Sequence, residues 1–327
     1  MDISIMLILA KIGLVFFAIL TAAAYLVFAE RKVLAWIQDR KGPNRVGPLG
    51  LLQPLADLIK MLAKEDVKPD GADRWLFYLA PAMAAIPAIM IFSVIPFGAP
   101  LTLLGEDVPL QVADPHVGLL FFMALSSIAV YGVALGGWAS NSKYALLGAI
   151  RGLAQLISYE LSMGLSLVPT VMLARSFRLS DIVAAQGGGN WFILTQPLAF
   201  AIFFISILAE CKRIPFDIPE AEGELVAGFH TEYSGMRFGL FFVGEYINVI
   251  VLGGLAATFF LGGWHGPLLP PSLWFIIKVL AFAFVFIWMR GTLPRLRYDQ
   301  LMHLGWKVLT PLALINILVT GWWLQLL

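Results

Sequence analysis

Long apolar stretches alternate with short polar segments along the whole chain. A bilayer core of about 30 Å needs about 20 apolar residues in a helix that crosses it. Eight stretches approach or exceed this length, at residues 4–29, 76–98, 117–138, 153–174, 193–209, 239–262, 273–290 and 308–326. The pattern predicts an all-α integral membrane protein in which residues 1–327 form one domain with about eight transmembrane helices.

The first stretch could be mistaken for a secretory signal peptide, because small residues at 22–24 follow an apolar run. Signal peptides begin with basic residues, whereas this chain has Asp2 there and places Glu30, Arg31 and Lys32 after the stretch. We therefore expect a retained helix.

Residues 51–64 show a different periodicity. Leucine and isoleucine recur there at spacings of three, four and seven, and Asp57, Lys60 and Lys64 occupy the rest of the helical wheel. This pattern predicts an amphipathic helix that lies in the membrane interface on the cytoplasmic side. Such a helix either anchors the protein to the surface or borders an opening through which an apolar ligand enters from the lipid.

Composition agrees with this pattern and excludes whole classes of protein. Charged residues make up 13% of the 327 residues, hydrophobic residues 60%, and mean hydropathy is +0.85. Soluble domains contain about 25% charged residues, because their surfaces must face water. The chain is therefore not a soluble enzyme, a nucleic-acid-binding protein or a disordered linker.

Positive charges gather in alternate connecting segments. Eighteen of the 22 Lys and Arg residues lie within residues 30–75, 139–152, 210–237 and 290–307. Because cytoplasmic loops carry the excess of Lys and Arg, these four segments are predicted to be cytoplasmic. Both termini are then expected on the opposite side of the membrane.

The sequence lacks the residues of a resident redox or metal centre. Cys211 is the only cysteine, and the four histidines are far apart, so no cluster, zinc or haem site is expected. The acidic segment lacks the frame of a calcium-binding EF-hand loop, and no nucleotide-binding glycine motif is present. Any redox chemistry must be carried by another chain or by a diffusible substrate.

The third cytoplasmic segment, residues 210–237, is acidic. Five carboxylates fall within its first fifteen residues, namely Glu210, Asp217, Glu220, Glu222 and Glu224. A helix that begins near Pro219 would place Glu220 and Glu224 on one face. Clustered carboxylates raise one another's pKa, so the segment is either a solvated acidic loop or a site that exchanges protons near neutral pH.

Two carboxylates lie inside predicted spans, Glu160 in the fourth and Glu245 in the sixth. A carboxylate at membrane depth is costly unless it is paired, protonated or hydrated, and such residues commonly line proton or ion paths. The other interpretation is a neutral side chain that forms a hydrogen bond between helices. Lys11 and Lys278 lie near the ends of spans, where we expect them to reach the interface or pair.

Several motifs resemble the H subunit of the proton-pumping NADH-quinone oxidoreductases (respiratory complex I), the family that includes mitochondrial NADH dehydrogenase subunit 1. They cover all four cytoplasmic segments and parts of several spans. The matching residues are 30–32, 40–47, 137–144, 155–160, 213–217, 220–225, 232–233, 241–246 and 294–300.

The resemblance implies a role in coupling quinone reduction to proton translocation. Glu160, Glu210 and Glu245 would belong to a proton path in the membrane, and Asp217, Glu220, Glu222 and Glu224 to the acidic loop beside the quinone chamber. Arg31, Asp57, Trp36 and Phe229 would contact the quinone. Arg213, Arg295 and Arg297 would form charge pairs around the loop. The third span carries no carboxylate, so a path across it would need water or the hydroxyls of Ser126, Ser127 and Tyr131.

The resemblance also implies partners and a location. The chain would bind no cofactor or metal itself, and a quinone, expected to be ubiquinone, would be its substrate. FMN and iron–sulfur clusters would belong to partner subunits. Expected partners are the quinone-site and terminal-cluster subunits, small membrane subunits, antiporter-like subunits and the lipid bilayer, with no nucleic acid. The location would be a bacterial inner membrane, with both termini periplasmic.

Two other functions remain open from the sequence. The chain could be the equivalent membrane subunit of a related membrane-bound hydrogenase-type complex. It could also be a stand-alone proton or cation channel, which would work as a single purified chain.

Overall fold

The computed structural model describes the backbone of residues 3–103 and 106–326, with the side chains of all but residues 3–7, 101–103, 106–107 and 222. The described residues form thirteen α-helices and one short β-hairpin. The helices are α1 (Ile3–Ile37), α2 (Gln53–Ala63), α3 (Arg74–Phe92), α4 (Gly118–Ala139), α5 (Lys143–Ala174), α6 (Leu179–Ala185), α7 (Phe192–Thr195), α8 (Pro197–Glu210), α9 (Glu222–Leu225), α10 (Gly235–Phe260), α11 (Pro271–Thr292), α12 (Tyr298–His303) and α13 (Thr310–Leu326). The antiparallel hairpin pairs β1 (Leu101–Leu103) with β2 (Glu106–Val108).

The prediction of a helical, multi-spanning membrane protein is confirmed. Within the described part of the chain, seven helices are long and apolar enough to cross a membrane, or eight if a bent pair counts as one span. The predicted amphipathic helix corresponds to α2, although it is shorter than residues 51–64.

Several helices extend beyond the apolar stretches that predicted them. Helix α1 continues to Ile37, and α5 begins at Lys143, ten residues before the stretch. The last helix begins at Tyr298 and reaches α13 through a π-helical turn at Leu304–Leu309. Hydropathy marks what the bilayer covers, whereas a helix continues into water as long as its backbone bonds form.

The fifth predicted span, residues 193–209, is not one straight helix. Helix α7 ends at Thr195, α8 begins at Pro197, and the polypeptide bends by 73° at this break. Proline has no N–H to donate and disfavours the helical conformation in the residue before it. Gln196 accordingly has φ −130° and ψ 55°, outside the helical region.

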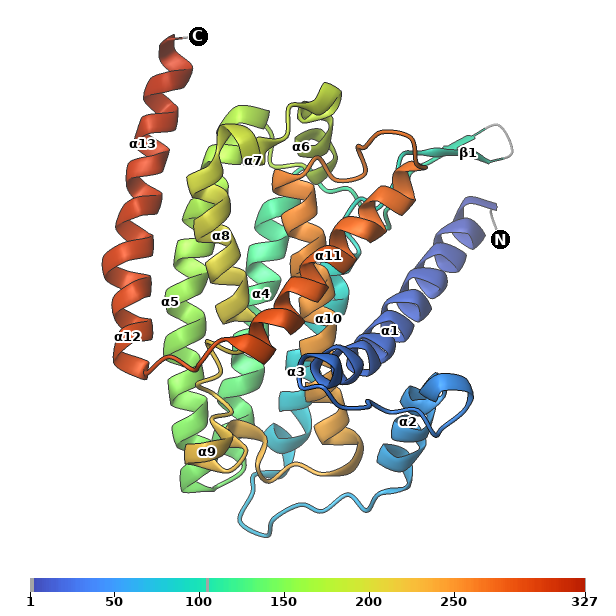
Figure 1. Cartoon of the computed structure of the whole chain (residues 1–327), viewed down its shortest axis with the longest axis vertical. Coiled ribbons are helices and arrows are strands. Elements are labelled where there is room, and N and C mark those ends of the chain that lie inside the picture. Colours follow the sequence, from blue (N-terminus) through green and yellow to red (C-terminus); the bar gives the residue numbers. More distant parts are fainter. Residues whose placement is uncertain (1–2, 104–105, 327) are drawn as a thin grey trace.

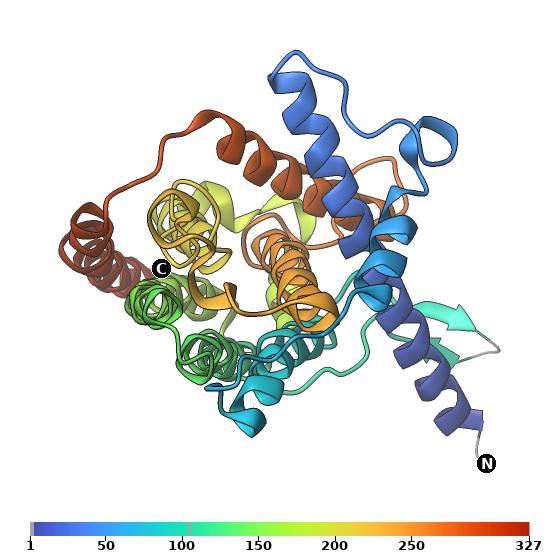
Figure 2. The ribbon, with the colours of Figure 1, turned by 90° about the horizontal axis from the view of Figure 1, so that it is seen from below.

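Five helices form the centre of the molecule, and the others lie around it. Figure 1 shows α3, α4, α5, α8 and α10 running roughly together, with α1 and α11 crossing obliquely and α13 at one edge. The end-on view in Figure 2 shows α2 beside α1, away from this centre. The acidic loop and α2 lie at one end of the bundle, and the β-hairpin, α6 and α7 at the other (Figure 1).

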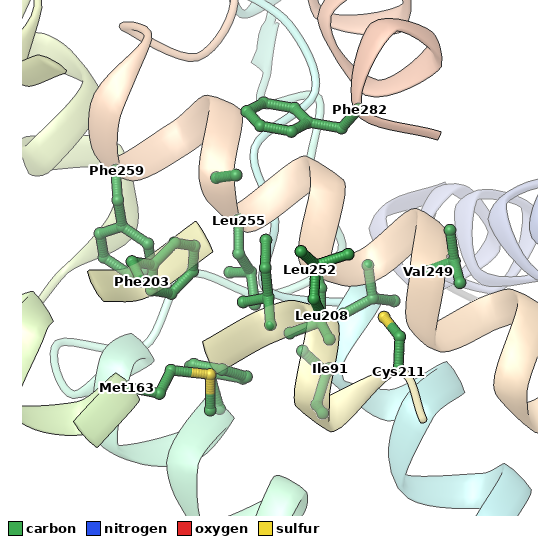
Figure 3. Close-up of a cluster of buried hydrophobic side chains, with 14 of the residues drawn as sticks. Ile91, Met163, Phe203, Leu208, Cys211, Val249, Leu252, Leu255, Phe259 and Phe282 are labelled. Carbon is green, nitrogen blue, oxygen red and sulfur yellow. The ribbon is translucent and has the colours of Figure 1, made fainter. Parts of the chain in front are cut away.

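The apolar core is centred on α10, most of whose second half is fully buried. Figure 3 shows Leu252, Leu255 and Phe259 of α10 facing Phe203 and Leu208 of α8. Cys211, just after α8, is buried at the edge of this cluster. The core thus fixes the end of α8, where the acidic loop begins.

Two lysines hold the loops at the end of the bundle opposite the acidic loop. The Lys278 ammonium donates to the backbone carbonyls of residues 261, 263 and 265 at 2.6–2.8 Å. Lys11 donates to the carbonyls of Pro109 and Gln111 at 2.9 and 3.0 Å. Both lysines therefore pair with backbone carbonyls, one of the two outcomes expected for them.

Helices α3 and α4 approach each other most closely at Gly132. A Cβ added there would lie 2.6 Å from the backbone nitrogen of Ala84, inside van der Waals contact. Because the obstacle is backbone, only a movement of one helix could relieve it. This contact sets the position of α4, which carries Ser126 and Ser127.

We expect Gly132→Ala to destabilise the protein by about 1–3 kcal/mol, since added volume in a packed interior forces helices apart. Gly13→Ala is the matched control, because a Cβ at Gly13 meets nothing within 4 Å and alanine favours a helix by about 1 kcal/mol. Thermal unfolding of the detergent-purified protein would show a lower Tm for the first variant only. Equal Tm values for both variants would contradict the close approach.

Candidate functional site

The acidic loop is folded back against the bundle by one buried amide. Gln155 of α5 donates to the carbonyls of Ala209 and Phe216, both at 2.7 Å, and so ties the end of α8 to the loop. Pro215 and Pro219 prevent a continuous helix through this segment. Gly228, with φ +59°, lies so close to the Pro219 carbonyl that a Cβ there would overlap it at 1.8 Å. These contacts hold Glu220 against α10.

Glu245 of α10 is the centre of the charged cluster. Its carboxylate lies 3.8 Å from the ammonium of Lys212 and 3.8 Å from the guanidinium of Arg213. It also forms a hydrogen bond with the Glu220 carboxyl, which requires one proton between the two groups. Burial, and then the charge of Glu245, raise the pKa of Glu220 well above its ordinary value, so Glu220 supplies that proton.

Two serines of α4 link the remaining carboxylates. Ser126 donates to Glu210 at 3.3 Å, and Ser127 donates to Glu160 at 2.5 Å. Glu210 and Glu160 are near enough for their charges to interact. Tyr131 is exposed on α4 and makes no hydrogen bond within the described chain. Two of the three hydroxyls named from the sequence therefore contact carboxylates.

A cavity of about 40 Å³ lies between Glu245 and Glu210. A space of this size can hold a small number of waters, given that one water needs about 10–15 Å³. One oxygen of each carboxylate has no hydrogen-bond partner among the described residues. The polar residues that line the cavity are Ser126, Glu210, Lys212, Glu245 and Asn248.

Asp217 lies in the acidic loop, near enough to this cluster for its charge to interact with Glu245 and Arg213. Arg295 donates to it at 2.9 Å, and the Leu296 amide donates to the Pro215 carbonyl at 3.0 Å, so the loops before α9 and α12 are joined. Burial raises the pKa of Asp217 to about 6, although Arg295 opposes the shift. Of the three arginines predicted to form charge pairs around the loop, Arg213 lies near Glu30 and Glu245, Arg295 pairs with Asp217, and Arg297 contacts Asp299 at 3.2 Å.

The remaining two carboxylates of the loop differ from expectation. Helix α9 begins at Glu222, after Glu220, so Glu220 and Glu224 do not share a helical face. Glu224 is 59% exposed and pairs with Arg151 at 2.7 Å, outside the buried cluster. The side chain of Glu222 lies outside the described part of the structure.

Glu30 is a buried member of the cluster that sequence reasoning missed. It pairs with Arg290 of α11 and lies 3.7 Å from Arg213, whose guanidinium stacks 4.5 Å from the Tyr246 ring. Residues 30–32 look like an ordinary polar stop after an apolar helix, so no local signal marks Glu30 as buried. Lys212 and Gln155 were missed for the same reason, since only the folded loop gives them partners.

The four residues expected to contact quinone divide into two groups. Arg31 forms an ion pair with Asp57 of α2 at 2.7 Å, and Trp36, further along α1, is 70% exposed. The apolar residues of α2 are also exposed. Phe229 is only 1% exposed and lies under the Lys212 ammonium, 5.0 Å from its ring centre. Phe229 therefore belongs to the interior cluster.

Burial holds the pKa of Asp217 near 6, above that of a solvated aspartate (about 4), so an opening that exposes Asp217 releases a proton and is favoured as pH rises through about 6. Hydrogen exchange at the Leu296 amide, corrected for intrinsic chemistry, should therefore be slower at pH 5 than at pH 7.5. Asp217→Asn should show the same corrected rate at both pH values, whereas Glu224→Gln should keep the wild-type response. A pH step that survives in Asp217→Asn would contradict the assignment.

Comparison with known proteins identifies the family. A family model described as NADH dehydrogenase matches residues 10–321. The chain is 86% identical over 318 residues to NADH-quinone oxidoreductase H subunit 1 of Geobacter metallireducens, an alignment that covers 97% of this chain and 96% of that protein. It is 84% identical over 313 residues to H subunit 2 of the same enzyme from Geobacter sulfurreducens, with 96% and 95% covered. The corresponding H subunit 2 of Syntrophobacter fumaroxidans is 67% identical over 318 residues, with 97% and 96% covered. The chain therefore belongs to the family of NADH-quinone oxidoreductase H subunits, as its motifs indicated.

Proposed function

We propose that this chain is the membrane subunit that couples quinone reduction to proton translocation in an NADH-quinone oxidoreductase. The observation that carries the proposal is the line of carboxylates from Asp217 and Glu220 in the acidic loop, through Glu245, to Glu210 and Glu160. Buried carboxylates at membrane depth are costly, and proton transfer is the common reason for keeping them.

Quinone reduction consumes two electrons and two protons. The electrons come from a terminal iron–sulfur cluster on a partner subunit, and FMN and the other clusters lie on further partners. This chain supplies the surroundings of the quinone and the groups that respond to the change in charge. Asp217 is suited to respond, because a pKa near 6 lets it gain or lose a proton near neutral pH.

The response passes inward through contacts between neighbouring groups. When the charge of Asp217 changes, the attraction to Arg295 and the repulsion of Glu220 change with it. Glu220 shares a hydrogen bond with Glu245, so its proton has a direct acceptor in the membrane domain. Glu245 and Glu210 line the same cavity, and the charge of Glu210 in turn interacts with that of Glu160. Water in the cavity and the hydroxyls of Ser126 and Ser127, which donate to Glu210 and Glu160, would carry the proton over the inner steps.

Helix α2 is proposed to border the opening through which quinone leaves the lipid. Its exposed apolar residues suit a hydrophobic tail, and the Arg31–Asp57 pair ties the helix to α1 beside the exposed Trp36. Asp57 is held in place by a hydrogen bond from Gln53 at 3.0 Å. The quinone is expected to be ubiquinone.

The assembly and its orientation complete the proposal. The chain would lie in a bacterial inner membrane with both termini periplasmic, which the excess of Lys and Arg in alternate segments supports. Its partners would be the quinone-site and terminal-cluster subunits on the cytoplasmic side, and small and antiporter-like subunits in the membrane.

Replacing Glu245 or Glu160 by Gln in the assembled enzyme removes a proton-carrying group while it keeps the shape. We expect proton pumping by proteoliposomes to fall at least about tenfold, since a positioned acid or base commonly contributes a factor of about 10²–10⁴. Glu65→Gln, at an exposed position after α2, is the control and should pump normally. Wild-type quinone reduction and pumping in both Glu245→Gln and Glu160→Gln would refute the relay.

Breaking the Arg31–Asp57 pair should loosen α2 rather than alter proton transfer. With Asp57→Asn we expect the KM for a long-tailed quinone to rise about two- to fivefold, because a partly exposed ion pair contributes up to about 1 kcal/mol. Asp299→Asn, which breaks an exposed pair on the same side, should leave KM unchanged. A lower proton-to-electron ratio at unchanged KM in Asp57→Asn would contradict this role.

A further inference from the structure

We propose that Lys212 is a movable cation that controls proton transfer between Glu245 and Glu210, an inference that rests on the proposed function above. Lys212 is then a positioning residue, because it acts through the two carboxylates and does not carry the proton itself. Its backbone conformation, its contacts and the cavity that it lines all support this role.

The backbone adopts an unfavourable conformation at Lys212, where the side chain lines the cavity. Lys212 follows the end of α8 with φ +51°, a left-handed conformation that is unfavourable for residues with a Cβ. The preceding Cys211 is buried in the core, and the Lys212 amide donates to the Ala209 carbonyl at 3.2 Å. The turn is therefore held by its surroundings, and it brings a lysine to the cavity instead of letting it reach water.

The Lys212 ammonium is largely but not fully enclosed, and it has no close partner. Its side chain is 11% exposed, its nearest carboxylate oxygen is that of Glu245 at 3.8 Å, and it makes no hydrogen bond to any described residue. The Phe229 ring lies 5.0 Å away on another side. A buried charge normally forms several hydrogen bonds, so a lysine that only touches its partner is free to move within the cavity.

Arg213 provides a comparison within the same cluster. Its guanidinium contacts Glu245, Glu30 and the Tyr246 ring together, so residues of two helices fix its position. Lys212 has a flexible four-carbon stem and contacts the same carboxylate from the cavity side. Contacts from α1 and α10 thus enclose Arg213, whereas Lys212 contacts Glu245 and Phe229 and otherwise faces the cavity, so Lys212 is the cation with room to move.

Lys212 can reach either end of the cavity. Glu245 and Glu210 both line it, each has an oxygen without a hydrogen-bond partner among the described residues, and the charge of Lys212 acts on both. The imidazole of His230 is disfavoured as a competing cation, because burial lowers its pKa although the charge of Glu245 opposes the shift.

These contacts give a cycle that moves one proton. The proton of Glu220 passes to the Glu245 carboxylate, which becomes neutral and no longer attracts Lys212. Glu210 begins the cycle protonated and Glu160 ionised, so when Lys212 moves toward Glu210 and favours its anion, the proton of Glu210 passes to the Glu160 carboxylate. The proton of Glu245 then crosses the cavity on water to the Glu210 carboxylate, and Lys212 returns to the Glu245 anion. One proton has moved from Glu220 to Glu160, and Glu245, Glu210 and Lys212 are back in their starting states.

The test compares three variants of the assembled enzyme in proteoliposomes, with quinone reduction and protons pumped per electron measured together. Lys212→Gln removes the movable charge and should lower the proton-to-electron ratio below half of the wild-type value. Lys212→Arg keeps the charge and should restore most of the ratio. Lys143→Gln removes an exposed lysine on the same side of the membrane and should leave both quantities unchanged.

A wild-type ratio in Lys212→Gln would overturn the inference. So would a parallel loss of reduction and pumping that Lys212→Arg does not rescue, because that result indicates a purely structural role. Asn248→Leu, which fills the cavity from α10, provides a second measurement if Lys212→Gln fails to assemble, and a wild-type ratio there would equally overturn the inference. Glu245→Gln and Glu160→Gln separate the two proposals: if both pump normally the relay itself fails, and if they lose pumping while Lys212→Gln does not, only the role of Lys212 fails.

Discussion

The cost of burying charge in an apolar domain is the constraint on which the rest of this structure depends. Glu245 is held inside the bundle by two cations and by a hydrogen bond to Glu220. None of these three partners lies on its own helix, so α10 can keep this carboxylate only if the loop after α8 folds back onto it. Two contacts hold the loop in this position. Gln155 donates to the carbonyls of Ala209 and Phe216, and Gly228 packs against the Pro219 carbonyl.

The same constraint explains how the obliquely crossing helices are attached. Helices α1 and α11 lie outside the central bundle, yet Glu30 of α1 lies near Arg213 beside the Glu245 cluster and also pairs with Arg290 of α11. Arg213 therefore connects the acidic loop to α1 and α10 directly, and to α11 through Glu30. A change of charge at Glu245 alters a contact on which the position of α1 and α11 depends, and α1 leads directly to α2 through the Arg31–Asp57 pair.

The sequence alone was enough to predict most of the transmembrane helices and to single out most of the carboxylates that lie in the charged cluster. Apolar length predicts a span because the bilayer imposes it, and a carboxylate within a span stands out because its cost is high. The bend at Pro197 could also have been predicted, since proline disfavours a helix through the residue before it. The ion-pair partners of these carboxylates could not be predicted in this way. Glu30 and Lys212 come after apolar stretches, as many exposed polar residues do, and only the tertiary fold places them inside the cluster. Glu220 and Glu224 would share a face only if a helix began near Pro219, and the local pattern does not say that α9 begins at Glu222.

Helix α4 has no carboxylate, so the proposed proton path would cross it on hydroxyl groups. A hydroxyl can accept one proton while it donates another, so it connects acids without the cost of a buried charge. Ser126 and Ser127 are adjacent and therefore point in different directions from the helix, one toward Glu210 and the other toward Glu160. The close contact of Gly132 with α3 fixes the position of α4 and hence of both serines. A small packing residue thus determines whether two carboxylates on other helices are connected, although it has no polar group of its own.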